Sequence, residues 1–159
     1  MVLGDNFTKG QLDATVEAAR ALRVEVVTES FGAPPYDLDA AFARGRAAQA
    51  NALIVLTSPA FSNQSAKIFE LAMKQRLPVS RGSRRYGDQG ILFCFSQDLA
   101  RHWARAGDIA ASILGGKTPG DIPLEQPSHF ELAINLRTAR ALGITVPQSM
   151  PQRADRVIE

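Results

Sequence analysis

The sequence has few side chains at spacings that would support catalysis, and its nearest match is to a phosphate-binding loop. Gly116, Lys117 and Thr118 follow the order found at the end of a P-loop. That motif also needs a glycine five residues before Gly116, where this chain has Ala111. It must follow a strand and open a helix, whereas a helix is expected to end here. A glycine C-cap followed by a turn is the simpler interpretation.

Other candidate residues for catalysis or metal binding are equally isolated. Asp5 follows the first predicted strand, as in phospho-receiver domains, but Thr57 and Ser58 stand where such a domain needs its phosphorylatable aspartate. His102 and His129 have no ligand partner at metal-binding spacing. The chain also lacks a Gly-x-Ser-x-Gly elbow and a dinucleotide glycine pattern. We therefore predict no enzyme activity, no cofactor and no metal.

Length and composition indicate one ordinary globular domain. The chain has 159 residues, of which 45% are hydrophobic and 21% charged, which is enough for a core of its own. A net charge of +2 gives little reason to expect a nucleic-acid partner. Arg81, Arg84 and Arg85 could bind an anion, but a solvated loop is the simpler interpretation. Cys94 lies in an apolar run, so we expect a buried, unreactive thiol.

Strand-like and helix-like segments alternate through the first half, which is typical of an α/β fold with a doubly wound parallel sheet. We predict strands at residues 1–3, 24–28, 52–56 and 77–80. We predict helices at residues 8–22, 38–48 and 62–75. Asp37 is the expected N-cap of the second helix, and Ser62 or Asn63 that of the third. Because residue 1 already lies in a strand, we expect the chain to be the rear portion of a longer protein.

The second half contains longer irregular segments between its elements. We predict strands at residues 90–95 and 130–134, and helices at residues 98–114 and 136–142. Asp98 is the expected N-cap of the longer helix, and Gly143 the C-cap of the shorter one. Residues 119–127 are predicted to be an extended linker, and residues 147–159 an irregular tail.

The carboxyl ends of the parallel strands remain as the place for a binding site. The loops at that edge offer hydroxyls, backbone N–H groups, an arginine and aromatic rings that could stack on a ligand. The candidate ligand-binding residues are Asn6, Phe31, Thr57, Ser58, Phe61, Gly82 and Arg84. The alternative is that these segments are ordinary strand-to-helix loops.

The last third of the chain carries a long, gapless pattern. It runs GGKTPGDIPLEQP at 115–127, FELAINLRTARALGI at 130–144 and RADRVIE at 153–159. This pattern closely resembles the carboxyl end of the ABC-transporter substrate-binding protein family that is related to the tryptophan- and tyrosine-binding lipoproteins. The resemblance extends upstream through residues 18–22, 52–61 and 77–98.

The resemblance implies the two-lobed periplasmic-binding fold of the first type, in which two α/β lobes close on a small molecule. Residues 1–88 would form the second ligand-binding lobe, and residues 89–159 a hinge, a remnant of the first lobe and a crossover tail. Thr57, Ser58 and Phe61 would supply hydroxyl, backbone and stacking contacts, while Gly82 to Arg84 would close the rim. Ser58 stands where the family often has aspartate, so the ligand's identity cannot be carried over.

These features predict a solute-binding component of an ABC-type uptake transporter, present as a partial chain that binds a small organic ligand without chemistry. The expected partners are an amino acid or aromatic solute and, for a full-length parent, an ABC permease, but no nucleic acid. One alternative is a ligand-sensing domain of a regulatory protein. Another is a hydrolase or transferase, which would need a nucleophile and a base in contact at the strand ends.

Two further expectations concern location and assembly. The family is periplasmic or membrane-anchored outside the cytoplasm, whereas this sequence shows no signal peptide and as written would be cytoplasmic. Missing partner strands would leave an apolar face uncovered at residues 91–95 and 130–134. We therefore expect a homodimer in which a second copy covers that surface.

Overall fold

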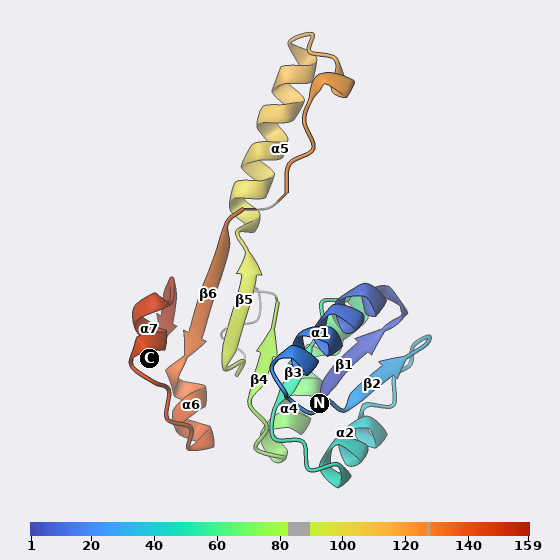
Figure 1. Cartoon of the computed structure of the whole chain (residues 1–159), viewed down its shortest axis with the longest axis vertical. Coiled ribbons are helices and arrows are strands. Elements are labelled where there is room, and N and C mark those ends of the chain that lie inside the picture. The colour runs from blue at the N-terminus through green and yellow to red at the C-terminus, as the bar shows by residue number, and fades with distance from the viewer. Residues whose placement is uncertain (83–89, 127) are drawn as a thin grey trace.

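A single sheet runs through the whole chain. The computed structural model describes residues 1–82, 90–126 and 128–159, and within them the sheet has seven strands in the order β2-β1-β3-β4-β5-β6-β7 (Figure 1). The strands are β1 (Val2–Asp5), β2 (Thr28–Phe31), β3 (Leu53–Val55), β4 (Val79–Arg81), β5 (Phe93–Gln97), β6 (Phe130–Asn135) and β7 (Arg156–Ile158). Every neighbouring pair is parallel except β5 and β6. The predicted α/β class with a doubly wound parallel sheet is confirmed, with the antiparallel pair of β5 and β6 as the exception.

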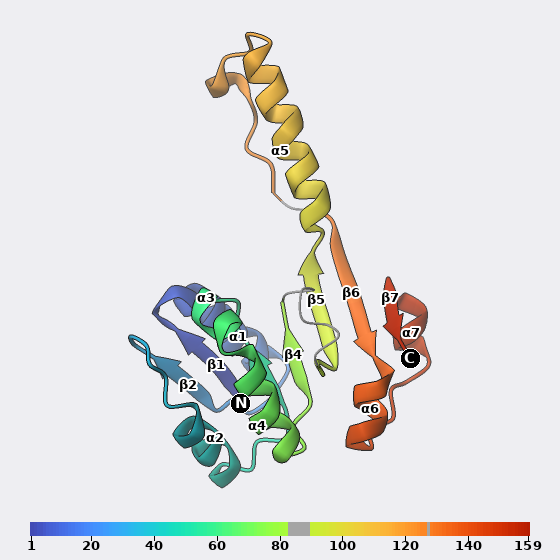
Figure 2. The same ribbon diagram turned by 180° about the vertical axis from the view of Figure 1, so that it is seen from behind.

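Helices connect the parallel strands and cover both faces of the sheet. They are α1 (Lys9–Ala21), α2 (Leu38–Ala47), α3 (Pro59–Asn63), α4 (Ser65–Lys74), α5 (Leu99–Leu114), α6 (Leu136–Leu142) and α7 (Ser149–Arg153). Right-handed crossovers place α1 on one face of the sheet, and α2 and α4, which contact each other, on the opposite face (Figure 1 and Figure 2). None of the described helices is long and apolar enough to span a membrane.

The core lies mainly between the central strands and the helices α2 and α4. Leu3, Leu53 and Val55 of the strands are buried together with Phe42 of α2 and Ile68 of α4. Burying a side chain of this size stabilises the fold by about 1.5–3 kcal/mol. The core therefore fixes the strands β1 and β3, whose carboxyl ends carry the polar residues described below.

The helix caps follow the sequence in most places. Asp98 caps α5 by accepting from two backbone N–H groups, and Gly143 ends α6 with a φ of 71°, as predicted. The predicted caps of the third helix, Ser62 and Asn63, are wrong, because Ser58 caps the short helix α3, which already contains both residues. The predicted helix is divided into α3 and α4.

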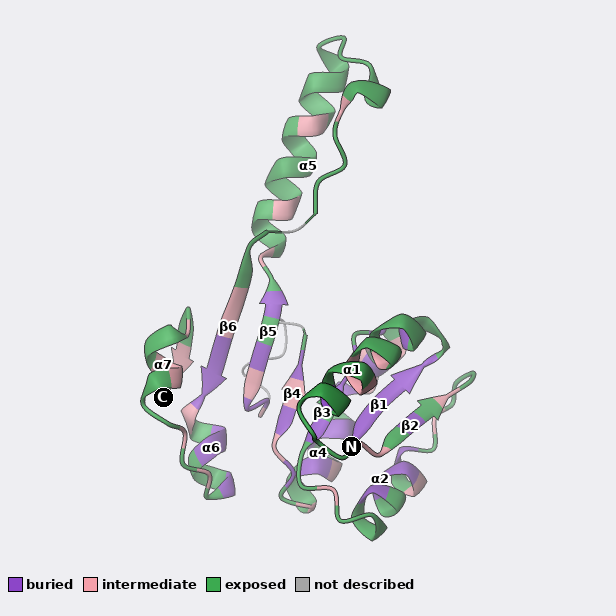
Figure 3. Cartoon of the chain, in the orientation of Figure 1, coloured by how far each residue is buried: buried purple, intermediate pink, exposed green. Residues whose placement is uncertain are grey.

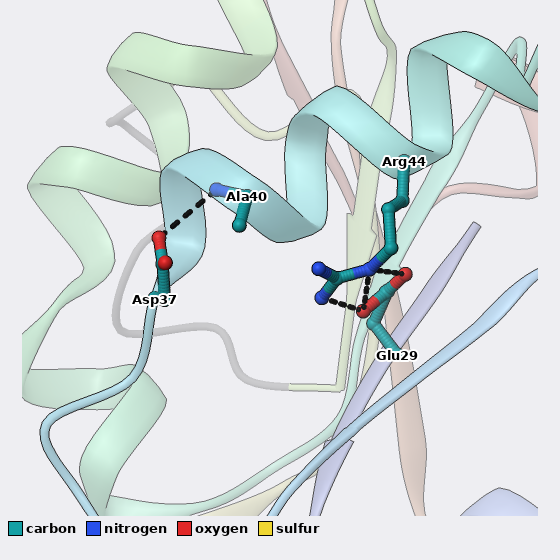
Figure 4. A network of polar contacts seen from close by, with 4 residues as sticks. All are labelled: Glu29, Asp37, Ala40 and Arg44. Atoms are coloured by element: carbon teal, nitrogen blue, oxygen red, sulfur yellow. Dashed lines mark hydrogen bonds and ion pairs between the residues drawn. The ribbon is translucent and has the colours of Figure 1, made fainter.

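The second helix begins as predicted and is tied to the sheet. The carboxylate of Asp37 accepts from the N–H of Ala40 at 3.0 Å (Figure 4). One turn further on, the Arg44 guanidinium donates to both carboxylate oxygens of Glu29 on β2, with the Nη2–Oε2 distance 2.6 Å (Figure 4). This paired geometry holds α2 beside the edge strand.

A long arm projects from the sheet. It consists of α5 and the extended return to β6, and it points away from the other helices (Figure 1 and Figure 2). No residue of α5 is buried (Figure 3). Its exposed apolar side chains include Trp103 at 75% and Leu114 at 89% exposure, with Leu124 of the return segment fully exposed. The arm therefore presents several large apolar side chains to solvent.

The apolar surface predicted at residues 91–95 and 130–134 is exposed in part. Ile91, Cys94 and Ile134 are buried, and β5 alternates between buried and more exposed residues along its length. Phe95, opposite Leu132 in the middle of the β5–β6 ladder, and Phe130, the first residue of β6, stack with ring centroids 5.3 Å apart and are each about half exposed. The buried thiol of Cys94 is confirmed.

The predicted division at residue 88 has no counterpart in the sheet. Strands β4 and β5 lie on either side of it and are parallel neighbours, with Ser80 opposite Phe93 and Arg81 opposite Cys94. The assignment of residues 1–88 and 89–159 to two lobes stays a prediction.

Candidate ligand-binding site

The strands β1, β2, β3 and β4 are parallel, so their carboxyl ends lie side by side at one end of the sheet. This end is called the carboxyl edge below. Asp5 ends β1, Phe31 ends β2, and Thr57 and Ser58 follow β3. Gly82 follows β4. Most of the predicted site residues therefore lie along a single edge.

Asp5 is the centre of a polar cluster at this edge. Its Oδ2 accepts from the hydroxyls of Ser58 at 2.5 Å and of Tyr36 at 3.0 Å. Its Oδ1 accepts from the backbone N–H groups of Phe7 and Thr8, both at 3.1 Å, and the Thr8 hydroxyl lies at the same distance. Asp5 is only 3% exposed. One buried carboxylate thus joins the ends of β1 and β3 to the loop after β2.

Hydrogen bonds keep this carboxylate ionised despite its burial. Burial alone would raise the pKa of Asp5, but the bonds from Ser58, Tyr36 and Thr8 outweigh it and lower the pKa below its ordinary value. Tyr36 shifts the opposite way, because burial and the bond to the charged Asp5 both raise the pKa of its phenol. The pair therefore consists of a carboxylate and a neutral phenol over the physiological range.

Three aromatic rings pack beside the polar cluster. Phe31 and Tyr36 stack with centroids 4.7 Å apart, and both are half-buried. Phe61 of α3 meets Phe31 edge-on at 5.9 Å and is itself fully buried in the core. Phe61 packs against the core side of Phe31 and Tyr36. Its own ring has no exposed surface on which a ligand could stack.

Thr57 lies against Gly82 at the neighbouring strand end. The side-chain amide of Gln11 on α1 accepts from the Thr57 N–H at 3.2 Å, so that backbone donor is already used. A Cβ atom at Gly82 would lie 3.2 Å from the Thr57 hydroxyl oxygen, which is closer than ordinary contact. The absence of a side chain at Gly82 lets the exposed Thr57 hydroxyl sit between β3 and β4.

The remaining predicted site residues contribute less to this cluster. Asn6 is exposed in the short 3-10 turn that follows β1. Arg84 lies outside the described residues, as does the neighbouring Arg85. Arg81, which was expected in a solvated loop, is instead buried in β4, and its guanidinium donates to the Ser62 hydroxyl at 2.8 Å.

Tyr36 is the site residue that sequence reasoning missed. It follows Pro35 in the loop before α2, and that loop folds back so that its phenol reaches Asp5. A search confined to the residues directly after each strand passes over it. The signal in the sequence is an aromatic residue that also carries a donor, placed beside a proline turn near the strand ends.

Two surface hollows lie away from this edge. One, of about 710 Å³, runs along the arm between α5 and residues 119–129, and its lining includes Arg101, Arg105 and Ile113. The other, of about 410 Å³, is lined by Arg46, Lys74 and Arg76 together with their neighbours. Among the described residues no group of three or more metal-ligating side chains is brought together.

The fold and the tail pattern define a class of protein, and the comparisons agree. The sequence profile of the family described as ABC transporter substrate binding protein matches residues 14–158. This chain belongs to that family. The predicted resemblance is confirmed.

The individual proteins that the chain resembles have low sequence identity to it. A tyrosine-binding protein from Clostridioides difficile is 29% identical over 77 residues, which are 48% of this chain and 22% of that protein. A conserved domain protein from Vibrio cholerae has a TM-score of 0.83 at 21% identity, over 98% of this chain and 54% of its own. The ABC domain from Streptococcus pneumoniae in complex with L-Trp has a TM-score of 0.80 at 20% identity, over 99% and 56%. This chain thus spans about half the length of the solved proteins that share its fold.

Proposed function

We propose that the chain is part of the solute-binding component of an ABC-type uptake transporter and holds a small organic molecule without transforming it. The observation that carries this proposal is the family match over residues 14–158. The strand-end cluster of Asp5, Tyr36 and Ser58 supports it, because ligands of parallel α/β sheets bind at that edge. No observation favours the regulatory alternative.

The proposed ligand is an amino acid, with an aromatic one preferred. One relative is named for tyrosine, and one solved neighbour is a complex with L-Trp. The half-buried rings of Phe31 and Tyr36 offer an apolar surface, and the hydroxyls of Thr57 and Ser58 lie beside them at the same edge. We keep Asn6, Gly82 and Arg84 as proposed residues of the rim.

The contact between Ser58 and Asp5 resembles a nucleophile beside a base, but we do not interpret it as a catalytic pair. Ser58 and Asp5 are close enough for proton transfer, and the sequence alone did not predict this pair. A carboxylate whose pKa is lowered is a poor general base at neutral pH. Both histidines lie elsewhere, at the arm hollow. We propose that the pair is structural and that the chain is not an enzyme.

Assembly and location follow from the family as proposals. A full-length parent would act outside the cytoplasm with an ABC permease, and a second lobe would complete the cleft. For the chain by itself, we propose a homodimer in which a second copy covers the apolar side of the arm, including Trp103 and Leu114.

Saturation-transfer NMR with the common amino acids tests the proposed function. Half a cleft is expected to bind in the millimolar range, about −4 kcal/mol. We expect transfer to L-tryptophan and L-tyrosine, weaker transfer to glycine, and recovery of every ligand unchanged. Conversion of any ligand, or transfer to none of them, would contradict the proposal.

A further inference from the structure

We infer that Asp5 sets the hydrogen-bonding polarity of the site: it takes the protons of Ser58 and Tyr36, so both hydroxyls accept, and the ligand is held there through a donor such as a primary ammonium group. Asp5 is then a positioning residue, and the half-buried Tyr36 hydroxyl is the ligand contact, while Ser58 is buried and caps α3. This inference rests on the proposed function and specifies which end of the ligand enters the cluster.

The count of protons at the cluster supports this polarity. A hydroxyl has one proton and two acceptor positions, and an ionised carboxylate only accepts. The Ser58 and Tyr36 oxygens lie 2.5 Å and 3.0 Å from Oδ2 of Asp5, so each proton is already committed. The buried Ser58 oxygen already accepts from the Phe61 N–H at 3.4 Å. The half-buried Tyr36 oxygen keeps acceptor capacity that only a donor can meet.

Charge favours the same kind of ligand group. The donors to Asp5 among the residues that the structure describes are neutral backbone N–H groups and hydroxyls, so these bonds leave its full negative charge in place. A cation beside the hydroxyls is attracted by that buried charge, and an anion is repelled. The apolar remainder of an aromatic amine would lie on the stacked rings of Phe31 and Tyr36.

Replacing Asp5 by asparagine reverses the direction of the hydrogen bonds to the two hydroxyls and keeps the number of non-hydrogen atoms. The N–H groups of Phe7 and Thr8 both donate to Oδ1, so asparagine keeps its carbonyl oxygen on that side. Its NH₂ group then faces Ser58 and Tyr36 and donates to them. The half-buried Tyr36 hydroxyl is then released to donate outward, which suits an acceptor such as a carboxylate.

The test compares two analogues that differ at one end. Tryptamine has the ammonium group without a carboxylate, and indole-3-propionate has the carboxylate without an ammonium. Each is titrated into the ¹⁵N-labelled chain, and binding is read from the amide shifts of Phe31, Tyr36 and Ser58. L-Tryptophan is titrated as the reference for the proposed function. Asp13→Asn on the exposed face of α1 removes the same charge away from the site and is the matched control.

The expected result is a clear preference for tryptamine in the native chain and in Asp13→Asn. Asp5→Asn should lower the affinity for tryptamine about tenfold, as expected for the loss of one charge-assisted interaction. It should bind indole-3-propionate at least as tightly as the native chain does. If Asp5→Asn fails to fold, Tyr36→Phe should still weaken tryptamine while keeping the ring stack. If the native chain binds indole-3-propionate as tightly as tryptamine or more tightly, the inference is overturned. Binding of L-tryptophan in the same experiment would still support the proposed function. Absence of shifts with all three ligands would overturn both.

Discussion

At the scale of single residues, Asp5 is the side chain whose hydrogen bonds hold the strand-end cluster together. Its carboxylate accepts from the Ser58 hydroxyl and the Thr8 N–H, both of which are buried and would lose this acceptor if the carboxylate were removed. We expect Asp5→Ala to lower the free energy of unfolding by about 2–4 kcal/mol, because each unsatisfied buried group costs about 1–3 kcal/mol. Urea denaturation at pH 7 measures this, with Asp13→Asn as the control that should change little.

The same residue makes stability depend on pH. Folding lowers the pKa of Asp5 below the ordinary 3.8, so the unfolded chain takes up the proton at a higher pH than the folded chain. Its contribution is complete above the unfolded value and is lost as the pH falls through the folded value. Denaturation from about pH 6 to about pH 2 should show a steeper loss of stability in the native chain than in Asp5→Asn. Parallel curves for the two proteins would rule this origin out.

The residues of the site were only partly predictable from the sequence. The placement of Thr57, Ser58 and Phe31 together was predictable because parallel strands must present their carboxyl ends at one edge. Tyr36 was missed because its contact with Asp5 depends on how a loop folds back, which no local pattern encodes. The burial of Phe61 was missed for a related reason, since the packing behind a strand end depends on distant helices.

At the scale of elements, the end of α6 offers a direct test of a backbone requirement. Gly143 has a φ of 71°, and a Cβ atom there would meet only ordinary contact, 3.8 Å from Arg76 Nη2. The cost of Gly143→Ala is therefore conformational, about 1 kcal/mol of unfolding free energy. Gly107→Ala, in the exposed middle of α5 with no atom within 4 Å, is the matched control and should not destabilise. Equal effects of the two substitutions in thermal denaturation would contradict this assignment.

Element boundaries show where local sequence stops being informative. Residues 24–27 have a strand-like composition, yet β2 begins at Thr28, because its register is set by pairing with Val2 of β1. The strand β7 was not predicted at all. It has three residues, and it exists through pairing with β6, where Ile134 lies opposite Val157. Long apolar periods such as that of α5 were read correctly, because they are strong over many residues.

At the scale of the whole molecule, we propose that the exposed apolar surface of the arm mediates assembly of the isolated chain. Trp103 is the only tryptophan, and it is 75% exposed on α5, so it reports directly on whether this surface becomes covered. We expect a dimer at high concentration in analytical ultracentrifugation, with a blue shift of the Trp103 emission as the dimer forms. Trp103→Glu should give a monomer, because it places a charge in the apolar contact.

A control for the assembly experiment places the same charge elsewhere. Ala18 is exposed on α1, far from α5 in the sheet order, and Ala18→Glu should leave the dimer intact. A monomer at every concentration, with Trp103 emission unchanged, would exclude the proposed contact. Dissociation by both substitutions would point to a general effect of charge instead.

The central claim, that the chain binds a solute at the carboxyl edge of its sheet, is tested most directly by locating L-tryptophan on the ¹⁵N-labelled chain. We expect the largest amide shifts at residues 5–8, at Phe31 and Tyr36, and at residues 57–61, with little change along α5. Shifts concentrated at residues 101–129, where the hollow of the arm lies, would contradict the account, as would a titration that moves no amide.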